Sequence, residues 1–80
     1  MDLKIAKEFY KIGVLDEIFI SRDVDESGKK CWILVLVSTK GQSWTLQTSS
    51  KKDKTFVSLD TAVAEIEAIC DRVSSLKFKV

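Results

Sequence analysis

The acidic run from Asp23 to Gly28 is the segment whose residue types come closest to a known binding chemistry. Asp23, Asp25 and Ser27 alternate and are followed by glycine, which matches the first half of an EF-hand calcium loop. The last position of such a loop needs a bidentate glutamate, but Leu34 occupies it here. The flanking residues also predict strands where that motif needs helices. We therefore interpret the segment as a polar hairpin turn.

A second group of residues could contact phosphate. Lys51, Lys52 and Lys54 lie close together, and Trp32 or Trp44 could stack on bases if either ring were exposed. The formal net charge is only +1, and the second predicted helix has an acidic outer side, so no general attraction to nucleic acid is expected. We favour a solvated loop and two core tryptophans, and keep weak nucleic-acid binding as an alternative function.

Residues for catalysis are sparse. The chain has no histidine, so the commonest general base and transition-metal ligand is missing. Neither cysteine has a base or a glycine-rich oxyanion loop nearby in sequence. The carboxylates are scattered over turns and a helix face. We expect no enzyme activity, no cofactor, no metal and no small-molecule substrate.

Cysteine usage and apolar runs predict the compartment. Cys31 and Cys70 fall on predicted core faces and are interpreted as buried reduced thiols. No signal peptide is visible at the N-terminus. The longest apolar run, Cys31 to Val37, is far too short to span a bilayer. A cytoplasmic protein that does not contact a membrane is the expectation.

The elements that must position these residues follow from the hydrophobic pattern. Eighty residues make one domain, residues 1–80, which is small enough for oligomerisation to matter. Helical spacing predicts a first helix from the N-cap Asp2 to Gly13 and a second helix that begins after Ser58. Strands are predicted at residues 17–22, 30–38, 43–48 and 76–80, with a short one at Phe56. The order α-β-β-β-(β)-α-β predicts an α+β two-layer sandwich, with a mostly antiparallel sheet and both helices on one face.

The second helix has the clearest pattern in the chain. Its apolar residues recur at helical spacing and predict one buried stripe. They are Leu59, Ala62, Val63, Ile66, Ile69, Cys70 and Val73.

The second strand is apolar on both sides, which is the most useful clue to function. Trp32, Leu34 and Leu36 point to one side, and Cys31, Ile33, Val35 and Val37 to the other. Two helices can cover only one face of a small sheet, so one row should remain as a contact surface. The predicted interaction surface consists of Phe19, Trp32, Leu34, Leu36, Thr45 and Gln47.

Three blocks of residues resemble a family of small plasmid-encoded, partition-associated accessory proteins. The blocks are Leu3-x-x-Ala6-x-x-Phe9 leading to Gly13-Val14, Trp44-x-Leu46, and Phe56-x-Ser58-Leu59-Asp60-x-Ala62. The chain departs from that family in its acidic Asp23-to-Gly28 turn and in ending without an acidic tail. The resemblance implies carriage on a plasmid or related mobile element and a non-catalytic helper role, with no defined active site.

The order of elements also resembles the double-stranded RNA-binding domain. That family uses lysines at the start of its second helix, whereas Asp60, Thr61 and Ala62 stand there.

The two-sided apolar strand predicts a protein-interaction module, acting as a homodimer or on another protein through the uncovered sheet face. The alternatives are weak nucleic-acid binding and an inhibitor of a host defence complex carried by a mobile element.

Overall fold

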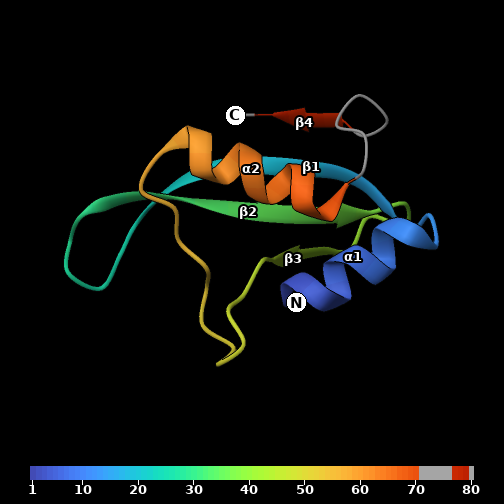
Figure 1. The fold of residues 1–80 in the computed structure, drawn as a ribbon, viewed down its shortest axis with the longest axis horizontal. Helices are drawn as coiled ribbons and strands as arrows, with labels where there is room; N and C mark the ends of the chain where they lie inside the picture. The colour runs from blue at the N-terminus through green and yellow to red at the C-terminus, as the bar shows by residue number, and fades with distance from the viewer. Residues whose placement is uncertain (71–76, 80) are drawn as a thin grey trace.

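Two helices and four strands form an α+β domain in the predicted order (Figure 1). The computed structural model describes residues 1–70 with their side chains and the backbone of residues 77–79. Val73 of the predicted helix stripe lies outside the described residues, as do Leu76 and Val80 at the two ends of the predicted last strand. The elements are α1 (Leu3–Lys11), β1 (Leu15–Val24), β2 (Lys30–Ser38), β3 (Ser43–Thr45), α2 (Leu59–Ile69) and β4 (Lys77–Lys79).

The four strands make one sheet in the order β3-β2-β1-β4. The pairs β1–β2 and β2–β3 are antiparallel, whereas β4 runs parallel to β1. Helix α2 lies across β1 and β2, and α1 packs beside it on the same side of the sheet (Figure 1). The predicted two-layer α+β architecture is confirmed.

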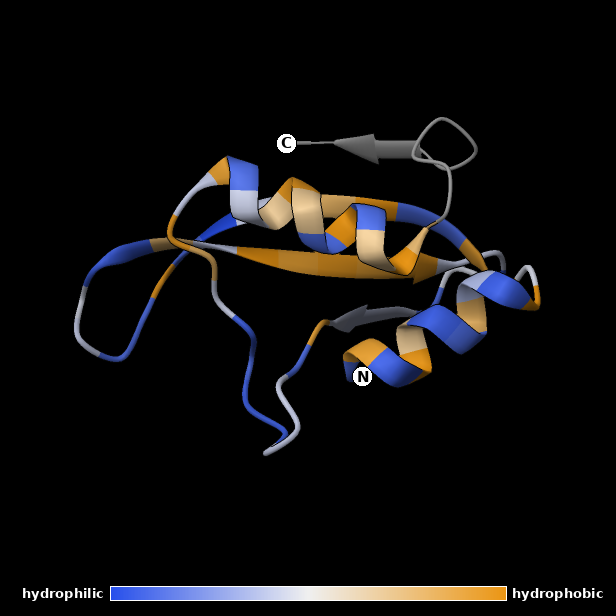
Figure 2. Ribbon diagram, in the orientation of Figure 1, coloured by the Kyte–Doolittle hydropathy of each residue, from blue (hydrophilic) through white to orange (hydrophobic). Residues whose placement is uncertain are grey.

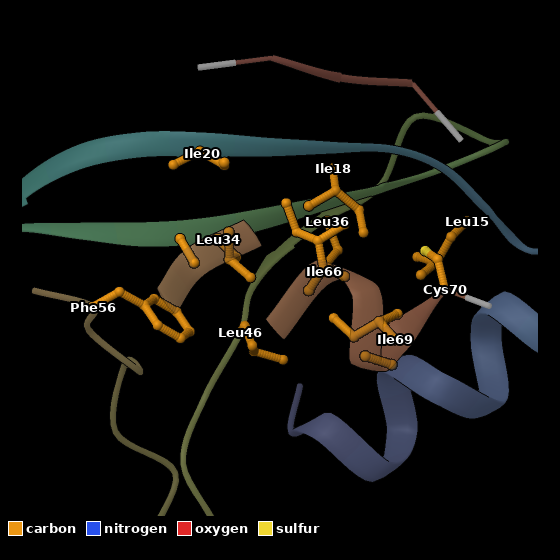
Figure 3. Packing of buried hydrophobic residues seen from close by; sticks show 12 residues of the cluster. Leu15, Ile18, Ile20, Leu34, Leu36, Leu46, Phe56, Ile66, Ile69 and Cys70 are labelled. Atoms are coloured by element: carbon orange, nitrogen blue, oxygen red, sulfur yellow. The ribbon is translucent and has the colours of Figure 1, made fainter. Parts of the chain in front are cut away.

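The core lies between the helices and one face of the sheet. Register places Ile18 opposite Leu36, with Trp44 next to Leu36 on β3. One step along, Ile20 is opposite Leu34, and the Leu46 amide donates to the Leu34 carbonyl. Figure 3 shows the Ile18 and Leu36 side chains close to Ile66 of α2. The buried cluster comprises Ala6, Leu15, Ile18, Ile20, Leu34, Leu36, Leu46, Phe56, Ala62, Ile66, Ile69 and Cys70.

Helix α2 begins where the sequence predicts. Ser58 has extended backbone angles, and its hydroxyl accepts a hydrogen bond from the Thr61 amide at 3.3 Å. This satisfies an amide that has no carbonyl partner in the first turn. The predicted stripe is confirmed at Ala62, Ile66 and Ile69, which are buried. It is wrong at Leu59, which is 37% exposed in the first turn of the helix.

Replacing Ser58 with alanine should lower the free energy of unfolding by about 1 kcal/mol, because the first turn loses its cap. Urea unfolding monitored by circular dichroism measures the change. Ser49→Ala is the matched control, because Ser49 is exposed and lies outside the helices. Equal stability of Ser58→Ala and the wild type would contradict the capping role.

The connection from β3 to α2 differs from the predicted strands. Strand β3 ends at Thr45 rather than Thr48, and Phe56 forms a single bridge to Trp32 rather than a strand. Both backbone groups of Trp32 bond Phe56, at 2.9 and 2.8 Å. The chain leaves the ladder because Gln47 bridges to Asp2 and Asp53 instead of continuing along β2.

Candidate interaction face

The side of the sheet away from the helices carries an apolar patch. Phe19 is opposite Val35, and Val35 is opposite Thr45, so these three form a row across β1, β2 and β3. Val37 and Ile33 flank Val35 along β2, and all five side chains are partly exposed. Figure 2 shows β2 hydrophobic along nearly its whole length, as this two-sided pattern requires. We call Phe19, Ile33, Val35, Val37 and Thr45 the outer patch.

The outer patch is bordered by polar residues. Glu17 and Ser43 flank Val37 in the register, and Ser21 is opposite Ile33. The helices α1 and α2 pack on the other face of the sheet. On the outer side, Cys31 continues the row of Ile33 and Val35 and is buried. An apolar centre with a polar border is the usual composition of a protein contact surface.

The predicted interaction surface is corrected at three positions. Leu34 and Leu36 are 0% exposed and lie under the helices, so neither can contact a partner. Trp32 lies on the same side and packs against the core. Phe19 and Thr45 do lie on the outer side, as predicted. Their apolar neighbours on β2 are Ile33, Val35 and Val37 rather than Leu34 and Leu36. The error arose because β2 is apolar on both sides, and alternation alone does not say which row meets the helices.

Gln47 is also corrected, because it lies beyond the end of β3 rather than in the outer patch. Its side-chain oxygen accepts a hydrogen bond from the N-terminal ammonium of Met1 at 3.0 Å, and its amide donates to the Met1 carbonyl. Gln47 therefore ties the start of the chain to the sheet.

The structure separates the predicted phosphate-contacting residues. Lys51 and Lys52 are exposed in the loop, but Lys54 forms an ion pair with Glu65 of α2. The Lys54 ammonium also lies 5.8 Å from the centre of the Phe56 ring. A phosphate at Lys54 would have to displace these contacts.

Neither tryptophan presents an open ring for base stacking. Trp44 packs edge-on against Phe9 of α1, with ring centres 5.6 Å apart. The Arg22 guanidinium covers the Trp32 ring at 5.1 Å. Of the residues predicted to contact nucleic acid, Lys51 and Lys52 are therefore exposed, whereas neither tryptophan ring is open for stacking.

The acidic segment forms a hairpin turn, as predicted. One carboxylate oxygen of Asp25 accepts hydrogen bonds from the Ser27 amide, the Ser27 hydroxyl and the Lys29 amide, at 2.9, 2.6 and 2.9 Å. These hydrogen bonds lower the pKa of Asp25, and the bond from the Ser27 hydroxyl has the largest effect. Within the described part of the chain no cluster of acidic or cysteine side chains could hold a metal ion.

Stability should depend on Asp25 only when it is ionised. Because the hydrogen bonds hold the folded-state pKa of Asp25 below its ordinary value, its contribution is present above the unfolded-state pKa and is lost as the pH falls through the folded-state pKa. Urea midpoints of wild type and Asp25→Ala should differ at neutral pH and approach each other as the solution is acidified. Glu26→Ala, which alters the exposed neighbour, is the control. A difference that persists unchanged in acid would contradict the account.

Cys31 and Cys70 are buried thiols, as predicted. Cys31 pairs with Asp23 in the β1–β2 ladder. Burial, and then the charges of Asp23 and Asp25, raise the pKa of the Cys31 thiol. A thiol held protonated in this way is a poor nucleophile at neutral pH.

Sequence reasoning missed Ile33, Val35 and Val37 as surface residues. The signal that could have found them lies in the neighbouring strands. Ile18 and Ile20 of β1 share one side, so the side of Phe19 is the poorer in apolar residues. A helix-covered face needs apolar residues on every strand, and only the side of Ile18 offers them.

No helix among the described residues is both long and apolar enough to cross a membrane. No family model, curated protein or solved structure matches this chain.

Proposed function

We propose that this chain is a non-enzymatic interaction module that self-associates through the outer patch. The observation that supports the proposal is the row of Phe19, Val35 and Thr45, flanked by Ile33 and Val37, on the face without helices. Apolar area of this kind in water favours association, because contact removes it from solvent.

A second copy of the chain is the partner that the composition of the patch favours. Two copies related by a two-fold axis near Val35 would place apolar residues against apolar residues. None of the five residues of the outer patch is charged. The nearest charged positions in register are Glu17, which is opposite Val37, and Lys79 of β4, which is opposite Phe19. No like charges would therefore meet at the centre. Burial would also support a domain that is small enough to be marginally stable alone.

The biological setting we propose is the cytoplasm of a cell that carries a plasmid or related mobile element. The support is the resemblance of three sequence blocks to partition-associated accessory proteins. In this fold, Ala6, Leu46 and Ala62 of those blocks are core residues and Ser58 is a helix cap. The blocks therefore specify the scaffold, and the outer patch would carry the helper role.

Sedimentation equilibrium of the full chain over micromolar to millimolar concentration tests the proposal. The expected average mass rises from 9.0 kDa towards twice that value. Added salt should change the association little, because the contact is apolar. An affinity that falls steeply with salt in the presence of RNA or DNA would instead indicate phosphate contacts. A strictly monomeric protein at millimolar concentration would overturn the proposal.

A further inference from the structure

Strand β1 has a stretch of free edge beyond its short parallel partner. It is 10 residues long, but β4 pairs only with Glu17, Ile18 and Phe19. From Ser21 to Val24 the outer edge of β1 has no partner among residues 1–70 and 77–79. This stretch leads into the hairpin that extends beyond the N-terminal start of α2 (Figure 1).

Two observations fix which backbone groups point outward from this edge. The Asp25 amide donates to the Lys29 carbonyl at 2.9 Å, which makes that pair a hydrogen-bonded one. Alternation along an antiparallel ladder then directs the amide and carbonyl of Arg22 and Val24 away from β2. The second observation agrees, because Trp32, which is opposite Arg22, uses both its backbone groups on Phe56 rather than on β1.

The side chains beside this edge supply a charge and an apolar surface. Arg22 is exposed, its guanidinium stacks on the Trp32 ring, and it has no ion pair within the described part of the chain. Val24 is 58% exposed. A shallow depression adjoins the edge, and its lining is Phe19, Ile20, Ser21, Arg22, Trp32 and Val35.

A second copy of the chain fits this edge poorly. Antiparallel self-pairing centred on Arg22 sets two guanidinium groups directly opposite one another, and pairing centred on Asp23 opposes two carboxylates. Pairing centred on Val24 sets Asp23 opposite Asp25. Pairing centred on Ser21 brings Phe19, which already pairs with β4, into the contact. Like charges directly opposite destabilise a strand pair, so the edge favours a different chain.

We propose that the free edge of β1 from Ser21 to Val24 binds an extended peptide strand that carries an acidic residue opposite Arg22 and apolar residues two positions to either side. The outward amide and carbonyl groups of Arg22 and Val24 pair with the peptide backbone, as in strand addition. The acidic side chain meets the uncompensated guanidinium, and an apolar side chain enters the depression. This inference does not rest on self-association through the outer patch. Phe19 and Val35 belong to both surfaces, but the outward backbone groups of Arg22 and Val24 that pair with the peptide lie outside that patch.

The probe that tests the inference is the peptide Ac-Thr-Val-Lys-Glu-Thr-Val-Thr-NH2, titrated into the isotope-labelled full chain at low protein concentration. Amide shifts are expected at Arg22 and Val24. The indole signal of Trp32 should also shift, because its ring lies against the Arg22 guanidinium. Exchanging the peptide glutamate for lysine should weaken binding about fivefold, which corresponds to the upper end of the range for one cross-strand charge pair. Arg22→Glu should reverse that preference.

Two protein variants separate edge binding from other sites. Val24→Pro removes an outward amide without taking a donor from the β1–β2 ladder, and should abolish binding while the remaining spectrum stays folded. Val37→Lys, which alters the outer patch at a residue outside the depression, should leave the Arg22 and Val24 backbone shifts in place. No shifts at millimolar peptide, shifts confined to Val35 and Val37, or full binding by Val24→Pro would each overturn the inference.

Discussion

Replacing Leu34 with alanine should remove a large part of the free energy of unfolding. Leu34 is 0% exposed at the centre of the β2 ladder, so truncation removes buried apolar atoms and leaves a cavity. The expected cost is about 2–5 kcal/mol. A domain of this length has a total stability of about 4–12 kcal/mol, so the loss is a large part of the whole. Urea unfolding followed by circular dichroism measures it.

Val35→Ala is the matched control for this substitution. Val35 is the next residue on the same strand, has the same backbone geometry and lies in the partly exposed outer patch. Its truncation removes two methyl groups that are already partly in water, so the expected cost is below about 1.5 kcal/mol. If Val35→Ala cost as much as Leu34→Ala, both faces of β2 would be equally buried, and the outer patch would not exist as a surface.

Val35→Lys should produce the largest change in self-association. The lysine stem can lie along the sheet with its ammonium in water, so the domain should stay folded. In a dimer, however, the charge would be buried near the axis opposite its copy. A central contact residue is typically worth about 2 kcal/mol or more, which predicts at least about a 30-fold rise in the dimer dissociation constant.

Ala64→Lys gives the corresponding control on the helix side. Ala64 is exposed on α2, so the same change from a small apolar residue to lysine falls away from the outer patch. Sedimentation equilibrium of both variants should show dimerisation lost in Val35→Lys and kept in Ala64→Lys. Equal dimerisation of the two would place the contact elsewhere on the molecule.

The elements of this fold follow from local sequence signals. Ser58 caps α2 and Ala62, Ile66 and Ile69 are buried, as the helical spacing predicts. The fold class follows from the order of such elements. The end of β3 does not, because it depends on Gln47 bonding to Met1, a contact between distant parts of the chain.

The face of the sheet that lies open could not be predicted from β2 alone. A strand apolar on both sides has no preferred face, and the choice is made by its neighbours in register. Phe19 is opposite Val35 rather than Leu34, and that single pairing moves the outer row from Leu34 and Leu36 to Val35 and Val37. Likewise, the free edge at Arg22 follows from the register with β4, whose last described pair is Lys79 with Phe19.

The most direct test of the account is the solvent exposure of methyl groups on alternate residues of β2. A soluble nitroxide is added to methyl-labelled protein dilute enough to be monomeric, and relaxation is measured at each residue. The account predicts strong broadening at Ile33, Val35 and Val37 and little at Leu34 and Leu36, with protection of the first group as the protein is concentrated. Similar protection of both groups in the monomer would contradict it.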